Sequence, residues 1–109
     1  MAFDEALADD IRMRLSDRSG LTEQEMFGGI AFMINGNMAV GVSGDELMVR
    51  VGKDAHEKAI SKPGARTFDM GARPMVGWVS VAAEGFDSEA AFNAWVDQGA
   101  AYAESLPPK

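Results

Sequence analysis

Cysteine is absent from the 109 residues. The chain therefore forms no disulfide, thiolate metal site, iron–sulfur cluster or cysteine nucleophile. Long apolar runs are also missing, because no segment approaches the ~18 consecutive apolar residues that a membrane-spanning helix needs. The N-terminal residues lack the basic segment and apolar stretch of a signal peptide. We therefore expect a cytoplasmic protein that does not associate with a membrane.

The remaining composition is typical of one globular domain, with 47% hydrophobic and 25% charged residues. The length excludes an enzyme with separate cofactor and substrate domains. The sequence contains no internal repeat, low-complexity segment or linker. We therefore expect a single domain over residues 1–109.

Positive charge is scarce and unevenly placed. The chain has 10 Lys and Arg against 17 Asp and Glu, for a net charge of −7, and such a chain is repelled by phosphate backbones unless its bases cluster. Residues 50–73 contain six of the bases and three acids, which gives this stretch a net charge of +3. The candidate anion-binding residues within it are Lys53, Lys58, Lys62 and Arg66. The interpretation that we favour is that Lys53, Lys58 and Lys62 form the solvated face of a short helix, because such faces are more common than binding faces.

Apolar periodicity predicts three helices, at residues 3–18, about 55–61 and about 88–105. Alternation of period two predicts a three-stranded antiparallel meander over residues 26–51, with Asn35-Gly36 as a hairpin turn. Two further strands are expected at residues 66–70 and 75–82. The predicted order is α-β(3)-α-β(2)-α, an α+β fold in two layers with helices on one face of an antiparallel sheet.

Helices on one face leave the second face of the sheet without a cover. If Ile30, Val40 and Val49 point toward the helices, the opposite side chains are mostly small or methionine. That opposite set is Ala31, Met33, Ala39, Gly41, Met48 and Arg50. A mostly apolar face that carries methionines favours a partner surface or a dimer interface. The alternative is that a terminus or loop covers it.

Trp78 alternates with Val79 and Val81 in the last predicted strand. If those valines point inward, Trp78 lies on the uncovered face and is a candidate anchor for a partner. In the opposite register it is a core residue. Arg50 and Arg73 flank this region and are candidates for a polar rim. The predicted partner-binding residues are Met33, Met48, Arg50, Arg73 and Trp78.

Motifs for catalysis or for a bound cofactor are weak. His56 is the only histidine, and no nucleophile or orienting carboxylate is placed beside it in the geometry that catalysis needs. We interpret it as an ordinary surface histidine. The glycines do not form a dinucleotide-binding or phosphate-binding motif. We therefore expect no enzymatic activity, no metal and no cofactor.

Three segments together resemble the TfoX N-terminal domain family. They are Met26-Phe27-Gly28-Gly29 entering a strand, Leu47-Met48-Val49-Arg50-Val51 as the third strand, and Pro74-Met75-Val76-Gly77-Trp78-Val79 before a helix with Trp95 and Tyr102. The resemblance covers roughly residues 10–105 and implies the same α-β(3)-α-β(2)-α order.

The family is named for regulators of natural competence, which assist the cyclic-AMP receptor protein at particular promoters and carry a second, helical domain. These 109 residues have no room for that second domain. From the uncovered face together with the resemblance, we expect a non-catalytic, stand-alone module that acts by contact with a protein partner or by self-association, in transcriptional or competence-type regulation. The alternative function is direct nucleic-acid binding through residues 50–73, which the net charge disfavours.

Overall fold

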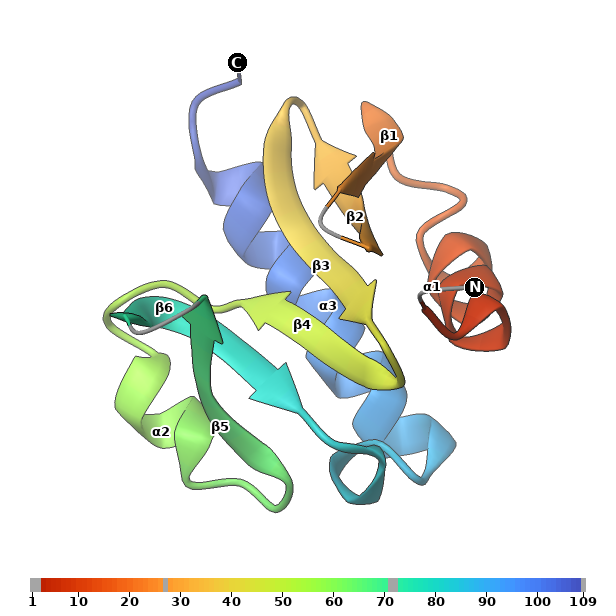
Figure 1. The fold of residues 1–109 in the computed structure, drawn as a ribbon. Coiled ribbons are helices and arrows are strands. Elements are labelled where there is room, and N and C mark those ends of the chain that lie inside the picture. Colours follow the sequence, from red (N-terminus) through yellow and green to blue (C-terminus); the bar gives the residue numbers. More distant parts are fainter. Residues whose placement is uncertain (1–2, 27, 71–72, 109) are drawn as a thin grey trace.

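The computed structural model describes residues 3–26, 28–70 and 73–108 (Figure 1). For Met26, Asp69, Met70, Arg73 and Pro74 it describes the backbone alone. The elements in chain order are α1 (Glu5–Arg14), β1 (Leu21–Met26), β2 (Gly29–Ile34), β3 (Asn37–Ser43), β4 (Glu46–Arg50), α2 (His56–Ile60), β5 (Ala65–Met70), β6 (Arg73–Val81), the 3₁₀ turn η1 (Ala83–Gly85) and α3 (Glu89–Ser105). The predicted α+β class and the alternation of helix, strands, helix, strands and helix are confirmed.

The described strands form one antiparallel sheet in the order β1-β2-β3-β4-β6-β5. The first run contains four strands rather than the three that the sequence predicts, because β1 precedes the expected meander. Its sequence, LTEQEM, is polar, as is common in edge strands, whose outer backbone faces solvent. Glu23 of β1 accepts a hydrogen bond from Arg12 Nε of α1 at 2.6 Å. Apolar periodicity misses a strand of this kind.

The helices differ slightly from their predicted lengths. α1 is shorter than residues 3–18, and Asp4 caps it by accepting a hydrogen bond from the Leu7 amide at 3.1 Å. α3 begins after Ser88, whose hydroxyl accepts from the Ala91 amide. It ends at Ser105, close to the predicted boundary. These caps satisfy amides that have no partner within the helix.

The predicted hairpin turn between β2 and β3 is confirmed. Asn35 and Gly36 both have positive φ, 54° and 83°, which is the conformation of a type I′ turn. Ile34 pairs directly with Asn37 across the turn.

The core lies on one face of the sheet. The register places Val40, Val49 and Val79 side by side on that face, and α1, α2 and α3 all contribute buried side chains to the same core cluster. Figure 1 shows α3 behind β3 and β4. A Cβ at Gly99 of α3 would lie 2.5 Å from the Ala39 carbonyl oxygen. The missing side chain therefore lets this helix approach β3 closely.

A β-bulge changes which side chains of β3 face the core. Phe32 pairs with Val40, but Met33 pairs with Met38, so Ala39 is the extra residue. Ala39 is fully buried in the core cluster, and its predicted place on the opposite face is wrong. Met38, which simple alternation places in the core, lies instead opposite Met33. One extra residue reverses the facing of the side chains beyond it.

Candidate interaction surface

The face of the sheet opposite the core carries most of the predicted interaction residues. The register places Ala31, Gly41, Met48, Ser80 and Arg66 in one row across it. In Figure 1 this face of β3 and β4 is toward the viewer, and neither a helix nor a described end of the chain lies in front of it. We call it the uncovered face. Its members in β2 to β6 include Ala31, Met33, Met38, Gly41, Glu46, Met48, Arg50, Arg66, Trp78 and Ser80. Thr22 and Gln24 of β1 and Ser43 of β3 lie at its margin on the same side of the sheet.

Methionine side chains cover the middle of the uncovered face. A Cβ on Gly41 would lie 2.9 Å from Met48 Cε and 3.1 Å from Met38 Cε. The two methyl groups therefore lie over the backbone of this glycine. Ala31, beside Gly41 in the sheet, is only 1% exposed, while Met38 and Met48 are half-buried. The centre of the face is apolar and is built from flexible side chains that can adapt to a partner.

Arg50 and Trp78 form one end of the uncovered face. The register pairs them directly between β4 and β6. Of the two registers that the sequence leaves open, the structure has the one in which Val79 and Val81 are buried and Trp78 faces away from the core. The Arg50 guanidinium carbon lies 5.1 Å from the centroid of the Trp78 ring and 5.4 Å from that of Tyr102. Both distances are typical of cation–π contacts. Tyr102 comes from α3, and the sequence gives no indication of this contact.

Gly52 makes room for Tyr102. It has a φ of +85°, and a Cβ there would lie 2.4 Å from Cε1 of the tyrosine ring. The chain turns out of β4 here, and the absence of a side chain lets the ring lie against the backbone. The ring thereby reaches Arg50 at the end of the strand.

His56 holds the backbone beside Trp78, and its interpretation as a surface histidine is wrong. The residue is only 5% exposed. Its Nδ1 accepts a hydrogen bond from the Gly77 amide at 2.9 Å, and its Nε2 lies 2.9 Å from Thr67 Oγ1. Because an amide can only donate, a neutral ring with its proton on Nε2 satisfies both contacts. The Gly77 carbonyl in turn accepts from the Val51 and Gly52 amides, which ties the end of β4 to β6.

Glu46, Arg66 and Ser80 form a second polar group on the uncovered face. Arg66 Nη2 and Ser80 Oγ each donate to Glu46 Oε1 at 2.7 Å. The hydrogen bond from Arg66 holds the pKa of Glu46 below its usual value, and Ser80 acts in the same direction. The charges of Arg66 and Glu46 therefore compensate each other, and the pair adds little net charge to the face.

The predicted anion-binding residues come from two parts of the fold. Lys53, Lys58 and Lys62 are exposed and lie in or beside α2, whose buried residues pack into the core. Arg66 extends from β5 on the uncovered face. The Lys62 ammonium lies 4.8 Å from the Trp95 ring centroid. The side chain of Arg73, the other predicted rim residue, lies outside the described residues.

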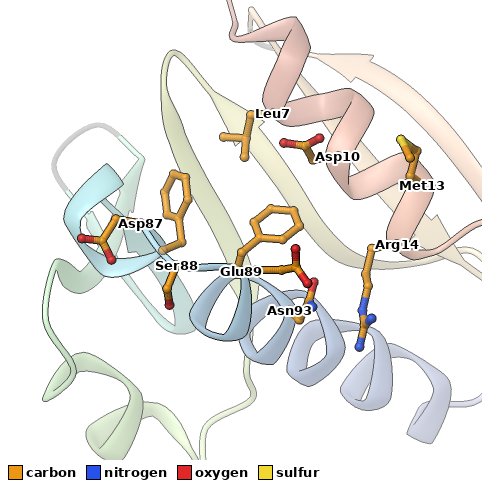
Figure 2. A pocket seen from close by; sticks show the side chains of 10 residues that line it. Leu7, Asp10, Met13, Arg14, Asp87, Ser88, Glu89 and Asn93 are labelled. Carbon is orange, nitrogen blue, oxygen red and sulfur yellow. The ribbon is translucent and has the colours of Figure 1, made fainter.

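A cleft of about 570 Å³ lies between α1 and the start of α3 (Figure 2). Leu7, Phe86 and Phe92 contribute apolar side chains to its lining, and Asp10, Asp87 and Glu89 contribute carboxylates. Arg14, which also lines it, donates to Asp97 at 3.0 and 2.6 Å. The positive charge in the cleft is thus already compensated, and the lining disfavours anionic ligands.

The carboxyl groups with shifted pKa values are partners of arginines. Among the described side chains, the carboxyl groups of Glu23, Glu46 and Asp97 have lowered pKa values, and the main cause in each is a hydrogen bond from an arginine. These are surface ion pairs. Among residues 3–26, 28–70 and 73–108, no group of three His, Cys, Asp or Glu side chains is arranged to hold a metal ion. The described helices are also too short or too polar to cross a bilayer.

One protein family, described as the TfoX N-terminal domain, matches residues 13–103. No curated protein and no solved structure matches the chain. The match covers the six described strands, α2 and all but the last two residues of α3, but only the last two residues of α1.

Proposed function

The chain belongs to the TfoX N-terminal domain family, and on that premise we propose that it is a non-catalytic protein-interaction module that binds through its uncovered face. The partner is another protein or a second copy of the chain. We place the module in the cytoplasm, in transcriptional or competence-type regulation. The observation that carries the proposal is the apolar centre formed by Met38 and Met48 over Gly41.

The centre of the uncovered face and its Arg50–Trp78 end have the residue composition of an interface core. Methionine, aromatic residues and arginine are enriched where proteins bind each other, whereas lysine and free carboxylates are depleted. Met33, Met38 and Met48 supply apolar area, and Trp78 with Arg50 supplies the residue types that dominate binding energy. The only carboxylate among the named residues of this face is Glu46, which Arg66 and Ser80 already bind.

The role of His56 supports a function without catalysis. A general base needs a nitrogen that is free to accept a proton from a substrate. Both ring nitrogens of His56 are occupied by Gly77 and Thr67, and the side chain is buried. The contacts of His56 are therefore structural.

Nucleic-acid binding through residues 50–73 is the alternative function. It depends on several cations that reach one phosphate backbone together. The contact of Arg66 with Glu46 and that of Lys62 with Trp95 weigh against it, as does the net charge of −7.

The proposal is tested by comparing two Met→Lys variants. Met48 lies on the uncovered face, whereas Met13 is on α1 and is 74% exposed, so Met13→Lys adds the same charge at a different surface. Wild type, Met48→Lys and Met13→Lys are immobilised, exposed to cell extract with and without nuclease, and their bound proteins are identified. Self-association of each is measured by sedimentation.

The proposal expects a nuclease-resistant partner, or a dimer, that wild type and Met13→Lys retain and Met48→Lys loses. If nuclease treatment abolishes the binding of proteins from the extract, the result supports the nucleic-acid alternative instead. Equal binding by all three proteins contradicts a role for the uncovered face.

A further inference from the structure

We propose that the partner presents a carboxylate to Arg50, carried within an apolar segment that packs on Met38 and Met48. The inference rests on the proposed function of the uncovered face and specifies the chemistry of its partner. The partner is an acidic, apolar segment of a protein.

Arg50 differs from the other arginines whose side chains the structure describes. Each of the others pairs with at least one carboxylate. They are Arg12 with Asp9 and Glu23, Arg14 with Asp97, Arg18 with Asp97 and Glu104, and Arg66 with Glu46. Among the described side chains, Arg50 has no carboxylate partner. Its contacts are instead with the faces of Trp78 and Tyr102.

The two rings restrict the motion of the Arg50 side chain. They come from different elements, β6 and α3, and lie 5.1 and 5.4 Å from the guanidinium carbon. Such contacts act on the faces of the guanidinium group and leave its five N–H donors, which lie in its plane, available. An arginine held in this way loses little further entropy when it binds a carboxylate with two hydrogen bonds.

Among the described side chains of the uncovered face, Arg50 carries the charge that no neighbouring side chain of opposite charge compensates. Arg66 is neutralised by Glu46, and the middle of the face consists of methionine, alanine and glycine. A chain with a net charge of −7 repels acidic segments in general. An acidic segment therefore binds only where a local positive charge attracts it, and Arg50 supplies that charge on the uncovered face.

A nucleic acid would suit this face less well. Phosphate backbones are bound by several cations along a groove and usually by stacked bases. Here a single cation is flanked by apolar side chains, and the Trp78 ring is already in contact with the guanidinium.

A library of random dodecapeptides displayed on phage tests the inference without a known partner. Selection is performed on wild type, Arg50→Gln and Arg66→Gln. The two variants lose the same formal charge from the same face, but only Arg50 lacks a carboxylate partner among the described side chains. Peptides selected on wild type are then synthesised in pairs, with Glu or Gln at the enriched acidic position.

We expect apolar peptides with a recurring Asp or Glu to be enriched on wild type and Arg66→Gln but not on Arg50→Gln. Arg50→Gln should weaken binding of the Glu peptide by about 10- to 100-fold, the usual effect of losing a charged hydrogen bond. The Gln peptide should bind wild type more weakly by a similar factor. Because the Glu and Gln peptides are compared on the wild-type protein, a folding defect cannot cause this difference in binding.

Methionine methyl NMR separates failure of this inference from failure of the proposed function. If selected peptides shift the Met38 and Met48 methyl signals but Glu and Gln peptides bind equally, the inference about Arg50 is overturned and the interaction face stands. If no selected peptide shifts these signals, the inference about Arg50 is overturned, and the comparison of Met48→Lys with Met13→Lys decides whether the interaction face stands. Enrichment of basic peptides, or equal loss in both arginine variants, also overturns the inference.

Discussion

The guanidinium of Arg50 lies over the indole ring of Trp78, 5.1 Å from its centroid, and the two residues are direct partners between β4 and β6. The contact joins a cation to the most voluminous aromatic side chain on the sheet face that no described helix covers. Its position depends on Gly77, the residue before Trp78, whose backbone bonds both to His56 and to the end of β4.

Replacement of Trp78 by alanine should weaken association while the fold persists. Trp78 is half-buried and outside the core cluster, so its loss removes a cation–π contact worth about 0.5–1 kcal/mol plus part of its apolar burial. We expect an unchanged circular dichroism spectrum and reduced partner binding or dimerisation. Trp95→Ala is the contrast, because Trp95 is 4% exposed in the core and its truncation should cost about 3–5 kcal/mol. Unfolding of Trp78→Ala would show that this residue stabilises the fold.

Replacement of His56 by leucine should destabilise the protein by about 2 kcal/mol or more, because it leaves the Gly77 amide without its acceptor. Urea denaturation provides the measurement. Thr67→Val is the matched control, since it removes only the partner of Nε2 and should cost about 1 kcal/mol. Wild-type stability in His56→Leu would contradict the structural role of this histidine.

Replacement of Gly99 by alanine should change the free energy of unfolding in opposite directions through helix propensity and through packing, so its sign shows which effect is larger. Propensity alone predicts a gain of up to about 1 kcal/mol in the free energy of unfolding. In the structure the new Cβ would lie 2.5 Å from the Ala39 carbonyl oxygen and 2.6 Å from Val40 Cγ1, so we expect a loss of about 1–3 kcal/mol. Thermal and urea denaturation give the sign directly, and stabilisation would show that α3 does not approach β3 this closely.

The free energy of unfolding should fall in acid partly because of Glu46. Its pKa is lower in the folded protein than its usual value of 4.5, chiefly because Arg66 donates to it. The folded state therefore binds fewer protons than the unfolded state, and the stabilisation present above pH 4.5 is lost as the pH falls through the folded pKa. Because the pair is partly exposed, the effect should be below about 1 kcal/mol.

Glu46→Gln should therefore show a shallower loss of stability between pH 6 and pH 3 than wild type. Glu57→Gln, at an exposed residue of α2, is the control for the change in net charge. If the free energy of unfolding depends on pH in the same way in wild type and Glu46→Gln, the proposed contribution of the Glu46–Arg66 pair is contradicted.

Patterns in the sequence predict those structural features that depend on residues adjacent in the chain. Asn35-Gly36 specifies its turn through the conformations that these residues tolerate. Alternation places Trp78 and Val79 on opposite faces of the sheet but leaves open which of the two faces the core. The bulge at Ala39 has no such local signal, because it arises where β3 meets both β2 and Gly99 of α3. The facing of Met38 was mispredicted for that reason.

The structural role of His56 and the contact of Tyr102 with Arg50 depend on long-range packing. The partners of His56 are 11 and 21 residues away in the sequence, and its short helix gives no sign that it is buried. Tyr102 belongs to the apolar stripe of α3, which predicts a core residue. Only the turn at Gly52 brings its ring to Arg50.

Methionine oxidation tests the central claim, that the uncovered face is a binding surface, most directly. Tagged protein is treated with limiting hydrogen peroxide alone and in cell extract, with a free methionyl peptide to normalise the dose, and oxidation is read by mass spectrometry. Met13, 74% exposed on α1, serves as the internal control. We predict that extract protects Met33, Met38 and Met48 but not Met13. For each methionine, the extent of oxidation in extract is divided by its extent in the protein alone. If this ratio is the same for Met33, Met38 and Met48 as for Met13, the claim is contradicted.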